Sequence, residues 1–399
     1  MVYVGVDIGK NKHAVAAVGD AGEIVMPPRF VTQDAGGFAS LSGALGALGG
    51  AAVVTIGMEA TGHYWKALRH DLAAQGYRVD VINPLVTSRE ASADVRGRKT
   101  DKLDALAIAT VVRRGGYSPA PAEHAGSDAL KAFARQRRYL VARRGDAKRR
   151  LVAALDVVFP EAAKTFGDLY SASSQSVIAA FPSARLAAGA DIRKLTTLFA
   201  KASGGKLGRA TAEEIRLAAR RSVSHTVVNE GEEFVAAQTV DEIRMLDALI
   251  AAAEKRLLSA EPPPAARILE SIKGTGKIQP RVAAAELGEL SRFAGPGMAA
   301  KVLAFAGCEP RVRESGTWKG RSKMSKRGSS TLRNSLYLMA CTVRLHSPCF
   351  NEIYKRHTAK GKHHNVAMSH VIRKLVEVMC GMYKNGTSFT APRPKDLPC

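Results

Sequence analysis

The stretch Val2 to Val18, VYVGVDIGKNKHAVAAV, decides the fold of the first part of the chain. Its two apolar runs flank the polar segment 8–12, which is the pattern of two strands joined by a turn. One carboxylate, Asp7, interrupts the apolar residues. A carboxylate in such a run is costly unless it is paired or binds a cation. For Asp7 alone, pairing with a lysine explains the residue as well as a function does.

The composition indicates a globular protein of two or three domains. The chain has 399 residues, of which 46% are hydrophobic, so it has enough apolar side chains for sizeable cores. No apolar run reaches membrane length, and we expect no signal peptide because Met1 leads directly into the first strand. The five cysteines form no C-x-x-C pair, which fits a reducing cytoplasm and argues against a zinc finger.

The charge of the chain indicates a polyanionic partner. The net charge is +23 and the pI is near 10, which is most simply explained by nucleic acid binding, although a merely basic, ribosome-like protein is the plainer alternative. Between Glu309 and Lys384 there are 16 Lys and Arg residues against four Asp and Glu. A second basic run lies between Lys131 and Arg150.

Residues 1–115 alternate between strand and helix patterns, which predicts an α/β domain. Further strands are predicted at 24–31, 53–59 and 79–82, and helices at 38–48, at 64–76 and from residue 101. The strand at 53–59 ends on a carboxylate, Glu59, and Thr100 is a good N-cap for the helix that follows it.

Four carboxylates of this domain are candidates for one site. Asp101 and Asp104 are three residues apart, on one face of the first helical turn. If the sheet is central, Asp7 and Glu59 reach the same point. Four converging carboxylates repel one another unless divalent cations with oxygen ligands bind there, and Mg²⁺ suits phosphate chemistry. The alternative is that Asp101 and Asp104 only complement the positive end of their helix.

The middle of the chain is predicted to be helical. In the basic helix at 125–160, the charges either follow a phosphate backbone or form a solvated face. Residues 160–232 are predicted to be a helical insertion without visible chemistry. A heptad pattern then predicts a helix–helix seam, within the chain or between subunits, at Ala236, Thr239, Ile243, Leu246, Ile250, Ala253 and Leu257. Prolines 262–264 end this helix and predict a domain boundary.

The last part of the chain contains a turn and a basic segment. Gly274-Thr275-Gly276 before a helix is either a turn that presents N–H groups to phosphate or a simple tight turn. Residues 311–328 combine small residues with cations, as a loop contacting a phosphodiester requires. Adjacent His363 and His364 cannot share a helical face, which argues against a histidine-only metal site. The cations that we expect to contact nucleic acid are Arg311, Arg313, Lys319, Arg321, Lys323, Lys326, Arg327 and Arg333.

Several motifs in this order resemble the DEDD-type insertion-sequence transposases, a family that includes Piv-like invertases and bridge-RNA-guided serine recombinases. In the first half they are V-G-V-D-I-G-K, I-G-M-E-A-T-G-H-Y, V-I-N-P and K-T-D-K-L-D-A. In the second half they are L-A-F-A-G-C-E-P-R, E-S-G, S-K-M-S-K-R-G and L-R-N-S-L-Y. The resemblance covers about 1–160 and 233–390, and it departs at 274–277, where the family usually has G-I-G-P.

The resemblance implies three parts. They are a RuvC-like (ribonuclease H fold) α/β domain at 1–124, a helical coiled-coil region at 125–264 with an insertion at about 160–232, and a mainly α C-terminal transposase domain at 265–399. It implies that Ser315, in the E-S-G match, is a nucleophile. It also implies that Mg²⁺ or Mn²⁺ is held by the acidic tetrad Asp7, Glu59, Asp101 and Asp104.

The resemblance further implies a DNA transposase or recombinase that works through a phosphoserine–DNA intermediate in the bacterial cytoplasm, at the nucleoid. Expected partners are target and donor DNA, a guide RNA, and further copies of the chain in a dimer or tetramer whose contact is the heptad seam. The 131–150 helix and the N-terminal domain are candidates for RNA contact. Two alternatives remain: a RuvC-type metal-dependent nuclease that hydrolyses DNA junctions, with Ser315 structural, and a non-catalytic nucleic-acid-binding protein.

Overall fold

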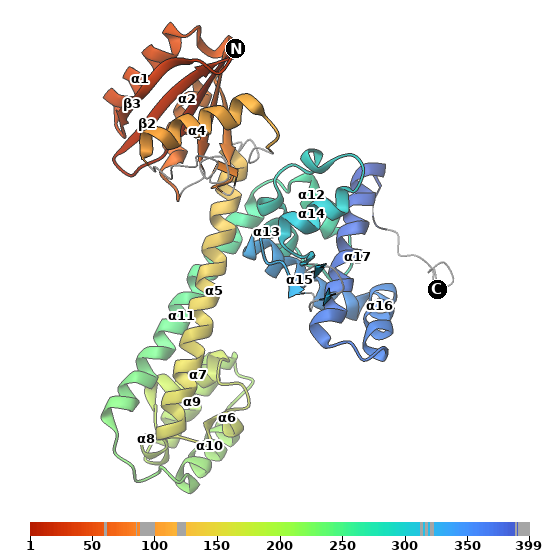
Figure 1. Ribbon diagram of the computed structural model, residues 1–399. Helices are drawn as coiled ribbons and strands as arrows, with labels where there is room; N and C mark the ends of the chain where they lie inside the picture. Colours follow the sequence, from red (N-terminus) through yellow and green to blue (C-terminus); the bar gives the residue numbers. More distant parts are fainter. Residues whose placement is uncertain are drawn as a thin grey trace. The chain divides into compact units, whose positions relative to one another are not determined.

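The structure is a computed structural model with two compact units, Met1–Glu123 and His124–Cys399 (Figure 1). It describes residues 1–59, 62–84, 86–87, 100–117, 125–311, 314–315, 318–319, 323–387 and 389, and at 125–127, 311, 314–315 and 318–319 it describes the backbone only. The expected boundary between 264 and 265 lies inside the second unit, so a division at that point stays a prediction.

A five-stranded mixed sheet forms the centre of the first unit. The strands are β1 (Val2–Asp7), β2 (Lys12–Gly19), β3 (Ile24–Thr32), β4 (Val54–Glu59) and β5 (Arg78–Ile82). Their order is β3-β2-β1-β4-β5, with β1 antiparallel to β2 and parallel to β4. The predicted hairpin and the predicted α/β alternation are therefore confirmed. Asp7, however, is the last residue of β1 and does not lie inside an apolar strand.

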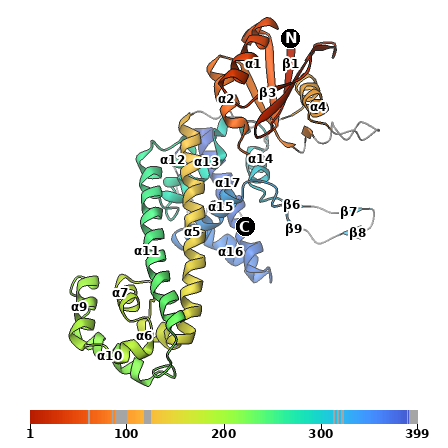
Figure 2. The same ribbon diagram turned by 90° about the vertical axis from the view of Figure 1, so that its left-hand side faces the viewer.

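Helices cover both faces of this sheet (Figure 2). The side chains of Val4 and Val6 pack with Leu41, Leu45 and Leu68 in one core. These leucines come from α1 (Ala35–Ala47) and α2 (Trp65–Ala74); a short 3₁₀ turn, η1 (Gly50–Ala52), follows α1. The opposite face is covered by α4 (Asp101–Arg114), whose predicted N-cap Thr100 accepts a hydrogen bond from the Leu103 backbone N–H.

Two paired glycines let α4 approach the sheet closely. Gly5 of β1 and Gly57 of β4 are register partners on the face that α4 covers. A Cβ atom placed on Gly5 would lie 2.0 Å from the Ala105 carbonyl oxygen and 2.4 Å from the Ala109 nitrogen. The sequence therefore needs glycine here, because any side chain would push α4 away from the strand ends.

We expect Gly5→Val to destabilise the protein by about 3 kcal/mol, because overpacking against a helix backbone forces the two elements apart. Urea unfolding measures this change. The matched control is Gly43→Ala in α1, where an added Cβ meets nothing within 4 Å; it is expected to be neutral or slightly stabilising. Equal stability of the two variants would contradict the packing described for Gly5.

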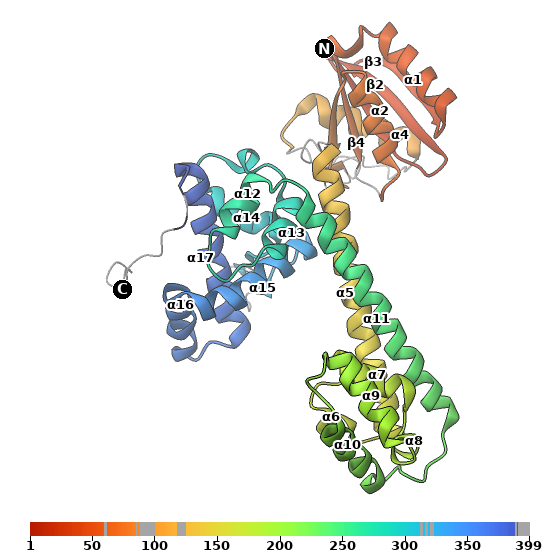
Figure 3. The same cartoon turned by 180° about the vertical axis from the view of Figure 1, so that it is seen from behind.

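Two long helices, α5 (Ala125–Val158) and α11 (Glu230–Ser259), pack along each other in the second unit (Figure 3). All seven predicted heptad residues are buried in α11. Several of them share a core with Leu151 and Leu155 of α5. The seam is thus within the chain. The expectation that it forms a subunit contact is wrong, because these side chains are already covered by α5.

The residues between these two helices form five shorter helices, as the predicted helical insertion requires. They are α6 (Ala162–Phe166), α7 (Ala172–Ala180), α8 (Ala184–Ala188), α9 (Ile192–Ser203) and α10 (Arg209–Arg221). Val177, Leu195, Phe199 and Ile215 make a small core of their own. The insertion is therefore a folded part of the chain with its own apolar interior.

Helices also dominate the C-terminal part, which surrounds one large core. They are α12 (Pro264–Glu270), α13 (Ile278–Leu287), the 3₁₀ turn η2 (Leu290–Phe293), α14 (Met298–Ala306), α15 (Ser330–His346), α16 (Pro348–Ala359) and α17 (His364–Asn385). Four two-residue strands lie between α14 and α15: β6 (Pro310–Arg311), β7 (Glu314–Ser315), β8 (Trp318–Lys319) and β9 (Lys323–Met324). The segment predicted as a loop thus contains two short antiparallel ladders, β6 with β9 and β7 with β8.

Candidate functional site

Asp7 and Glu59 end neighbouring parallel strands on the face of the sheet that α4 covers. Val6 of β1 pairs with Met58 of β4, so the next residue of each strand is a carboxylate. Side chains alternate along a strand, and Val6 and Met58 belong to the core on the α1 and α2 face. Asp7 and Glu59 therefore point to the opposite face.

The first turn of α4 lies at this same end of the sheet. Asp7 pairs with Ala14, and Ala14 pairs with Phe30. The Lys102 Nζ atom lies 5.7 Å from the centre of the Phe30 ring. At the other end of α4, Arg113 donates a hydrogen bond to the Asp20 backbone oxygen, just beyond β2. Because α4 runs opposite to β1, Asp101 and Asp104 lie at the edge where β1 and β4 end.

The carboxylates at this edge differ in their surroundings. Asp101 is exposed, whereas Asp7, Glu59 and Asp104 are half-buried. Thr87, which is buried, donates a hydrogen bond from Oγ1 to Glu59 Oε2 at 2.7 Å. Thr87 thus orients Glu59 from the segment after β5, and sequence reasoning did not identify it, because a single threonine carries no motif.

Asp80 is another carboxylate on this face, but its partners are structural. It pairs with Gly57 in the parallel register and is buried. Arg78 Nη2 lies 3.1 Å and the Tyr117 hydroxyl 2.8 Å from Asp80 Oδ2. Burial and this hydrogen bond raise the pKa of Tyr117 well above its usual range. The carboxylate of Asp80 is therefore already bound by Arg78 and Tyr117, and we assign it a structural role.

We call the edge with Asp7, Glu59, Asp101 and Asp104 the acidic edge. Across the described residues, no three His, Cys, Asp or Glu side chains are close enough together to hold a metal ion. The structure thus brings the four residues to one edge and one face without joining their oxygens in a ligand set. Their donor chemistry, carboxylate oxygen only, is the chemistry that Mg²⁺ and Mn²⁺ prefer.

The segment that carries Ser315 begins and ends in two stretches that pack closely against each other, residues 307–309 and 325–327. We call these two stretches the base of the segment. The Ser325 N–H donates to the Glu309 oxygen and the Lys326 N–H to the Gly307 oxygen. Gly307 has φ 66°, and a Cβ atom there would lie 2.8 Å from the Arg327 oxygen. Position 307 therefore requires glycine, both for its backbone angle and for its contact with Arg327. For Ser315 itself the structure describes only the backbone, in β7.

The candidate nucleic-acid-binding cations fall into three groups. Lys323, Lys326 and Arg327 are exposed near the base of the segment. Arg333 instead donates a hydrogen bond from Nη1 to the Ala306 oxygen, at the end of α14. Arg313 and Arg321 lie outside the described residues, and the side chains of Arg311 and Lys319 are not described.

A buried carboxylate in α13 joins this base to α5. The Glu286 side chain is 1% exposed, and Arg135 Nε lies 2.7 Å from Glu286 Oε1. The Ser329 hydroxyl donates to Glu286 Oε2 at 2.7 Å and also accepts from the Leu332 N–H, which caps α15. Burial opposes ionisation, but the hydrogen bonds from Arg135 and Ser329 outweigh it and lower the pKa of Glu286. The start of α15 is therefore fixed by an ionised group held from α5.

We expect Arg135→Ala to lower the free energy of unfolding at pH 7 by about 1–3 kcal/mol, since it leaves a buried carboxylate without its cation. This expected loss of stability is smaller than for a fully buried ion pair, because the Arg135 side chain is 56% exposed and water screens the pair. In the wild type, the lowered pKa means that the stabilisation is complete above pH about 4.5 and is lost as the pH falls.

The pH dependence of this variant has a distinctive sign. We expect that without Arg135 burial outweighs the remaining Ser329 hydrogen bond and Lys131 charge and raises the pKa of Glu286. The folded state then binds more protons than the unfolded state, and stability falls as the pH rises. Urea midpoints at pH 5 and pH 8 measure this trend. Adding Glu286→Gln removes the titrating group and is expected to abolish the trend; a trend that persists would contradict the assignment to Glu286.

Part of the basic run of α5 forms ion pairs with α11. Arg137 Nε lies 2.7 Å from Glu254 Oε1, and Arg144 Nη1 lies 2.5 Å from Asp247 Oδ1. Arg150 also reaches an α11 carboxylate, at 3.6 Å. Exposed pairs of this kind contribute little stability, but they fix the register of the two helices. These paired charges therefore join the two helices, whereas Arg143, Arg149 and Arg150 remain exposed, and their contact with a phosphate backbone stays a prediction.

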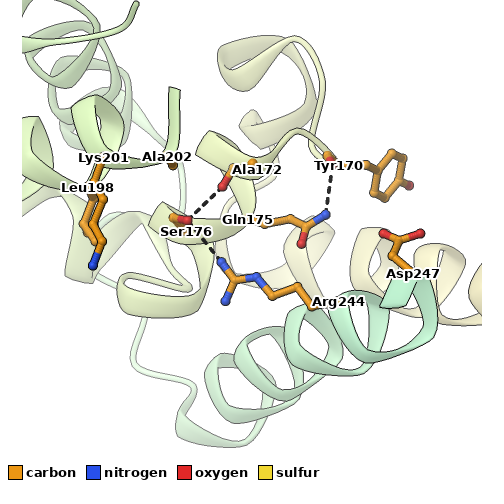
Figure 4. A pocket seen from close by; sticks show the side chains of 9 residues that line it. All are labelled: Tyr170, Ala172, Gln175, Ser176, Leu198, Lys201, Ala202, Arg244 and Asp247. Atoms are coloured by element: carbon orange, nitrogen blue, oxygen red, sulfur yellow. Dashed lines mark hydrogen bonds between the residues drawn. The ribbon is translucent and has the colours of Figure 1, made fainter. Parts of the chain in front are cut away.

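A hollow of about 690 Å³ lies between α7, α9 and α11 (Figure 4). Arg244 of α11 donates to the Ser176 hydroxyl, and Gln175 donates to the Tyr170 oxygen. The hollow is in the helical insertion, whereas the acidic edge belongs to the other unit. None of the described helices combines the length and apolar character needed to cross a membrane.

Comparison with known proteins matches both halves of the chain. Residues 4–160 match a family model described as transposase, and residues 266–355 match one described as the transposase IS116/IS110/IS902 family. The insertion element IS116 uncharacterized 44.8 kDa protein of Streptomyces clavuligerus is 24% identical over 98% of this chain and 97% of its own length. The insertion element IS900 uncharacterized 42 kDa protein of Mycobacterium paratuberculosis is 27% identical over 96% of each. The two models cover the acidic edge and the Ser315 segment.

Proposed function

The chain belongs to the DEDD-type transposases of the IS110 family, and from this premise we propose that it cuts and rejoins DNA strands through a phosphoserine–DNA intermediate at Ser315. A transposase binds DNA and cleaves it. The single observation that supports the catalytic part is the acidic edge, where β1, β4 and α4 bring four carboxylates to one face of the sheet.

The acidic edge suits a divalent cation. Asp7, Glu59, Asp101 and Asp104 would hold Mg²⁺ or Mn²⁺, which supplies charge neutralisation at the scissile phosphate when it is bound. Thr87 restricts the Glu59 side chain through its hydrogen bond. The close contact at Gly5 holds α4, which carries Asp101 and Asp104, against β1.

The serine step conserves the phosphodiester bond energy. The Ser315 oxygen loses its proton to solvent or a base and attacks phosphorus, while the 3′ oxygen leaves and becomes a 3′-hydroxyl. A 3′-hydroxyl of another strand then attacks the phosphoserine and releases the serine hydroxyl. Cutting and rejoining thus balance without ATP or any other co-reactant.

Guide RNA and further copies of the chain are part of the proposal. The support is the resemblance to bridge-RNA-guided recombinases, in which base pairing would read sequence while the protein reads backbone and shape. Arg137 and Arg144 of α5 are paired with α11, so the exposed Lys323, Lys326 and Arg327 are better candidates than these two for backbone contact. A subunit contact would have to use a surface other than the heptad seam.

A hydrolytic nuclease of the RuvC type is the second candidate. The acidic edge supports it equally, because the same carboxylates would then serve attack by water. In that case Ser315 is structural, and the cut DNA carries no protein.

A denaturing gel separates the two candidates. Labelled target and donor DNA are incubated with the protein, Mg²⁺ and RNA transcribed from DNA flanking the gene, with parallel reactions in EDTA and without RNA. A slow, protease-sensitive band together with joined strands is expected. Shortened DNA without any adduct would contradict the serine proposal and favour hydrolysis; products formed in EDTA would contradict the role of the cation.

A further inference from the structure

The turn between α16 and α17 carries an unusual density of cations. Five exposed Lys and Arg side chains surround it, which we call the turn cluster: Lys355, Arg356, Lys360, Lys362 and Arg373. Along the described parts of the chain, none of the five has an ion pair with a carboxylate. The contrast with α5 is informative, because there the arginines reach carboxylates of α11.

Two histidines fix the geometry of the turn cluster. The rings of His357 in α16 and His370 in α17 stack with their centres 3.6 Å apart and their planes 6° apart. Lys362 Nζ lies 3.3 Å from His370 Nε2, so the ammonium donates to an unprotonated ring nitrogen. The stacked pair holds the end of α16 against α17 and thereby sets the spacing of the cations.

The surroundings of the two histidines lower the pKa of both. Burial and the positive charges of Lys362 and Arg373, together with His357, lower the pKa of His370 to about 4. Burial and the neighbouring Lys362, Lys360 and Arg356 lower the pKa of His357. The ring nitrogen Nδ1 of His357 is buried without a hydrogen-bond partner. Burial makes the largest contribution to both lowered pKa values, and the surrounding cations add to it in the same direction.

A second connection makes this surface rigid. The Tyr354 hydroxyl lies 2.9 Å from His364 Nδ1, and Arg344 of α15 lies over the Tyr354 ring at 4.4 Å. The three helices α15, α16 and α17 are therefore tied together beneath the cations. Exposed cations gathered on one surface without ion pairs among the described residues attract a polyanion, which releases its own counterions on binding.

We propose that the turn cluster, which shares no residue with the Ser315 segment or with the acidic edge, binds the phosphodiester backbone of a nucleic acid. Exposed lysine and arginine side chains at a helical turn suit contact with the phosphate backbone, which positions a nucleic acid without reading its bases. The proposal rests on the proposed function only in taking nucleic acid as the partner, and duplex DNA and RNA share the chemistry that it recognises.

The test is equilibrium binding of the full chain, in EDTA, to a random-sequence DNA duplex and to a single-stranded RNA over a range of salt concentrations. The variant carries Lys360→Ala, Lys362→Ala and Arg373→Ala. Its affinity is expected to fall about 10-fold or more for at least one polymer, with a salt slope smaller by about 3 for the DNA duplex or about 2 for the single-stranded RNA. A matched control removes three exposed cations of the insertion: Arg193→Ala, Lys206→Ala and Arg221→Ala.

Each outcome decides the proposal. A selective loss in the cluster variant supports it, and the polymer affected identifies the source of the backbone. Equal losses of affinity in the cluster variant and the control variant would contradict the proposal, because they would show an effect of net charge alone. An unchanged affinity in the cluster variant would also contradict it. Lys360→Arg with Lys362→Arg keeps the charge and is expected to bind normally, which separates lost contacts from misfolding. The binding experiment does not depend on formation of the protein–DNA adduct by the wild type. The proposed function and the proposed binding surface can therefore be supported or contradicted independently.

Discussion

Asp7→Asn is expected to abolish DNA cleavage and joining, with a rate at least about 1,000-fold below the wild type. Asparagine preserves the shape of the side chain at the end of β1 but removes the negative charge that a divalent cation needs. Asp7 is half-buried at the centre of the acidic edge, on the strand that α4 and β4 both contact. Its charge is therefore the one that the proposed site depends on most.

The control for Asp7→Asn is Asp20→Asn in the same unit. Asp20 is exposed and accepts a hydrogen bond from Tyr3 at 3.0 Å, remote from the acidic edge. The control is expected to retain activity, and both variants are expected to unfold at wild-type urea concentrations within about 0.5 M. Strand joining by Asp7→Asn within a few-fold of the wild-type rate would contradict the role of the acidic edge.

Ser315→Ala is expected to remove the covalent protein–DNA species completely, and strand joining with it, while DNA binding changes little. No other group on the chain replaces the attacking oxygen in the proposed chemistry, so the loss is expected to exceed about 1,000-fold. Gel assays of adduct and joined product, with binding measured in parallel, separate chemistry from affinity.

Ser325→Ala is the matched control for the serine. Ser325 lies at the base of the same segment, and its hydroxyl accepts the Arg327 N–H at 3.4 Å. It is expected to retain adduct formation. An adduct that survives Ser315→Ala and disappears in Ser325→Ala would move the nucleophile to the base of the segment.

Much of the first unit follows from its sequence. The alternating valines at 2–6 and the second apolar run from Ala14 predict the hairpin, and Thr100 before two acidic residues predicts the start of α4. The position of Asp7 at the end of β1 was missed because apolar runs show that strands exist without showing where pairing stops. The orientation of Glu59 by Thr87 was out of reach, because it depends on a contact between residues 28 positions apart.

The second unit was less predictable, because its decisive contacts are distant in sequence. The heptad in α11 predicted a seam but not its partner, and a basic helix does not reveal that its arginines meet carboxylates about 100 residues later. Helix α16 was not predicted: its apolar side is short, with Cys349 and Phe350 buried and Ile353 and Tyr354 partly buried against the core. The turn cluster arises only when α16 and α17 fold back on each other.

The central claim is that Ser315 forms a covalent bond to DNA, and mass spectrometry of the trapped complex tests it most directly. The protein is incubated with target and donor DNA, RNA and Mg²⁺, and the complex is then digested with nuclease and protease. The account predicts a peptide containing Ser315 with a nucleotide attached through a 5′ phosphate. Cut DNA with every peptide unmodified, or a nucleotide on a different residue, would contradict it.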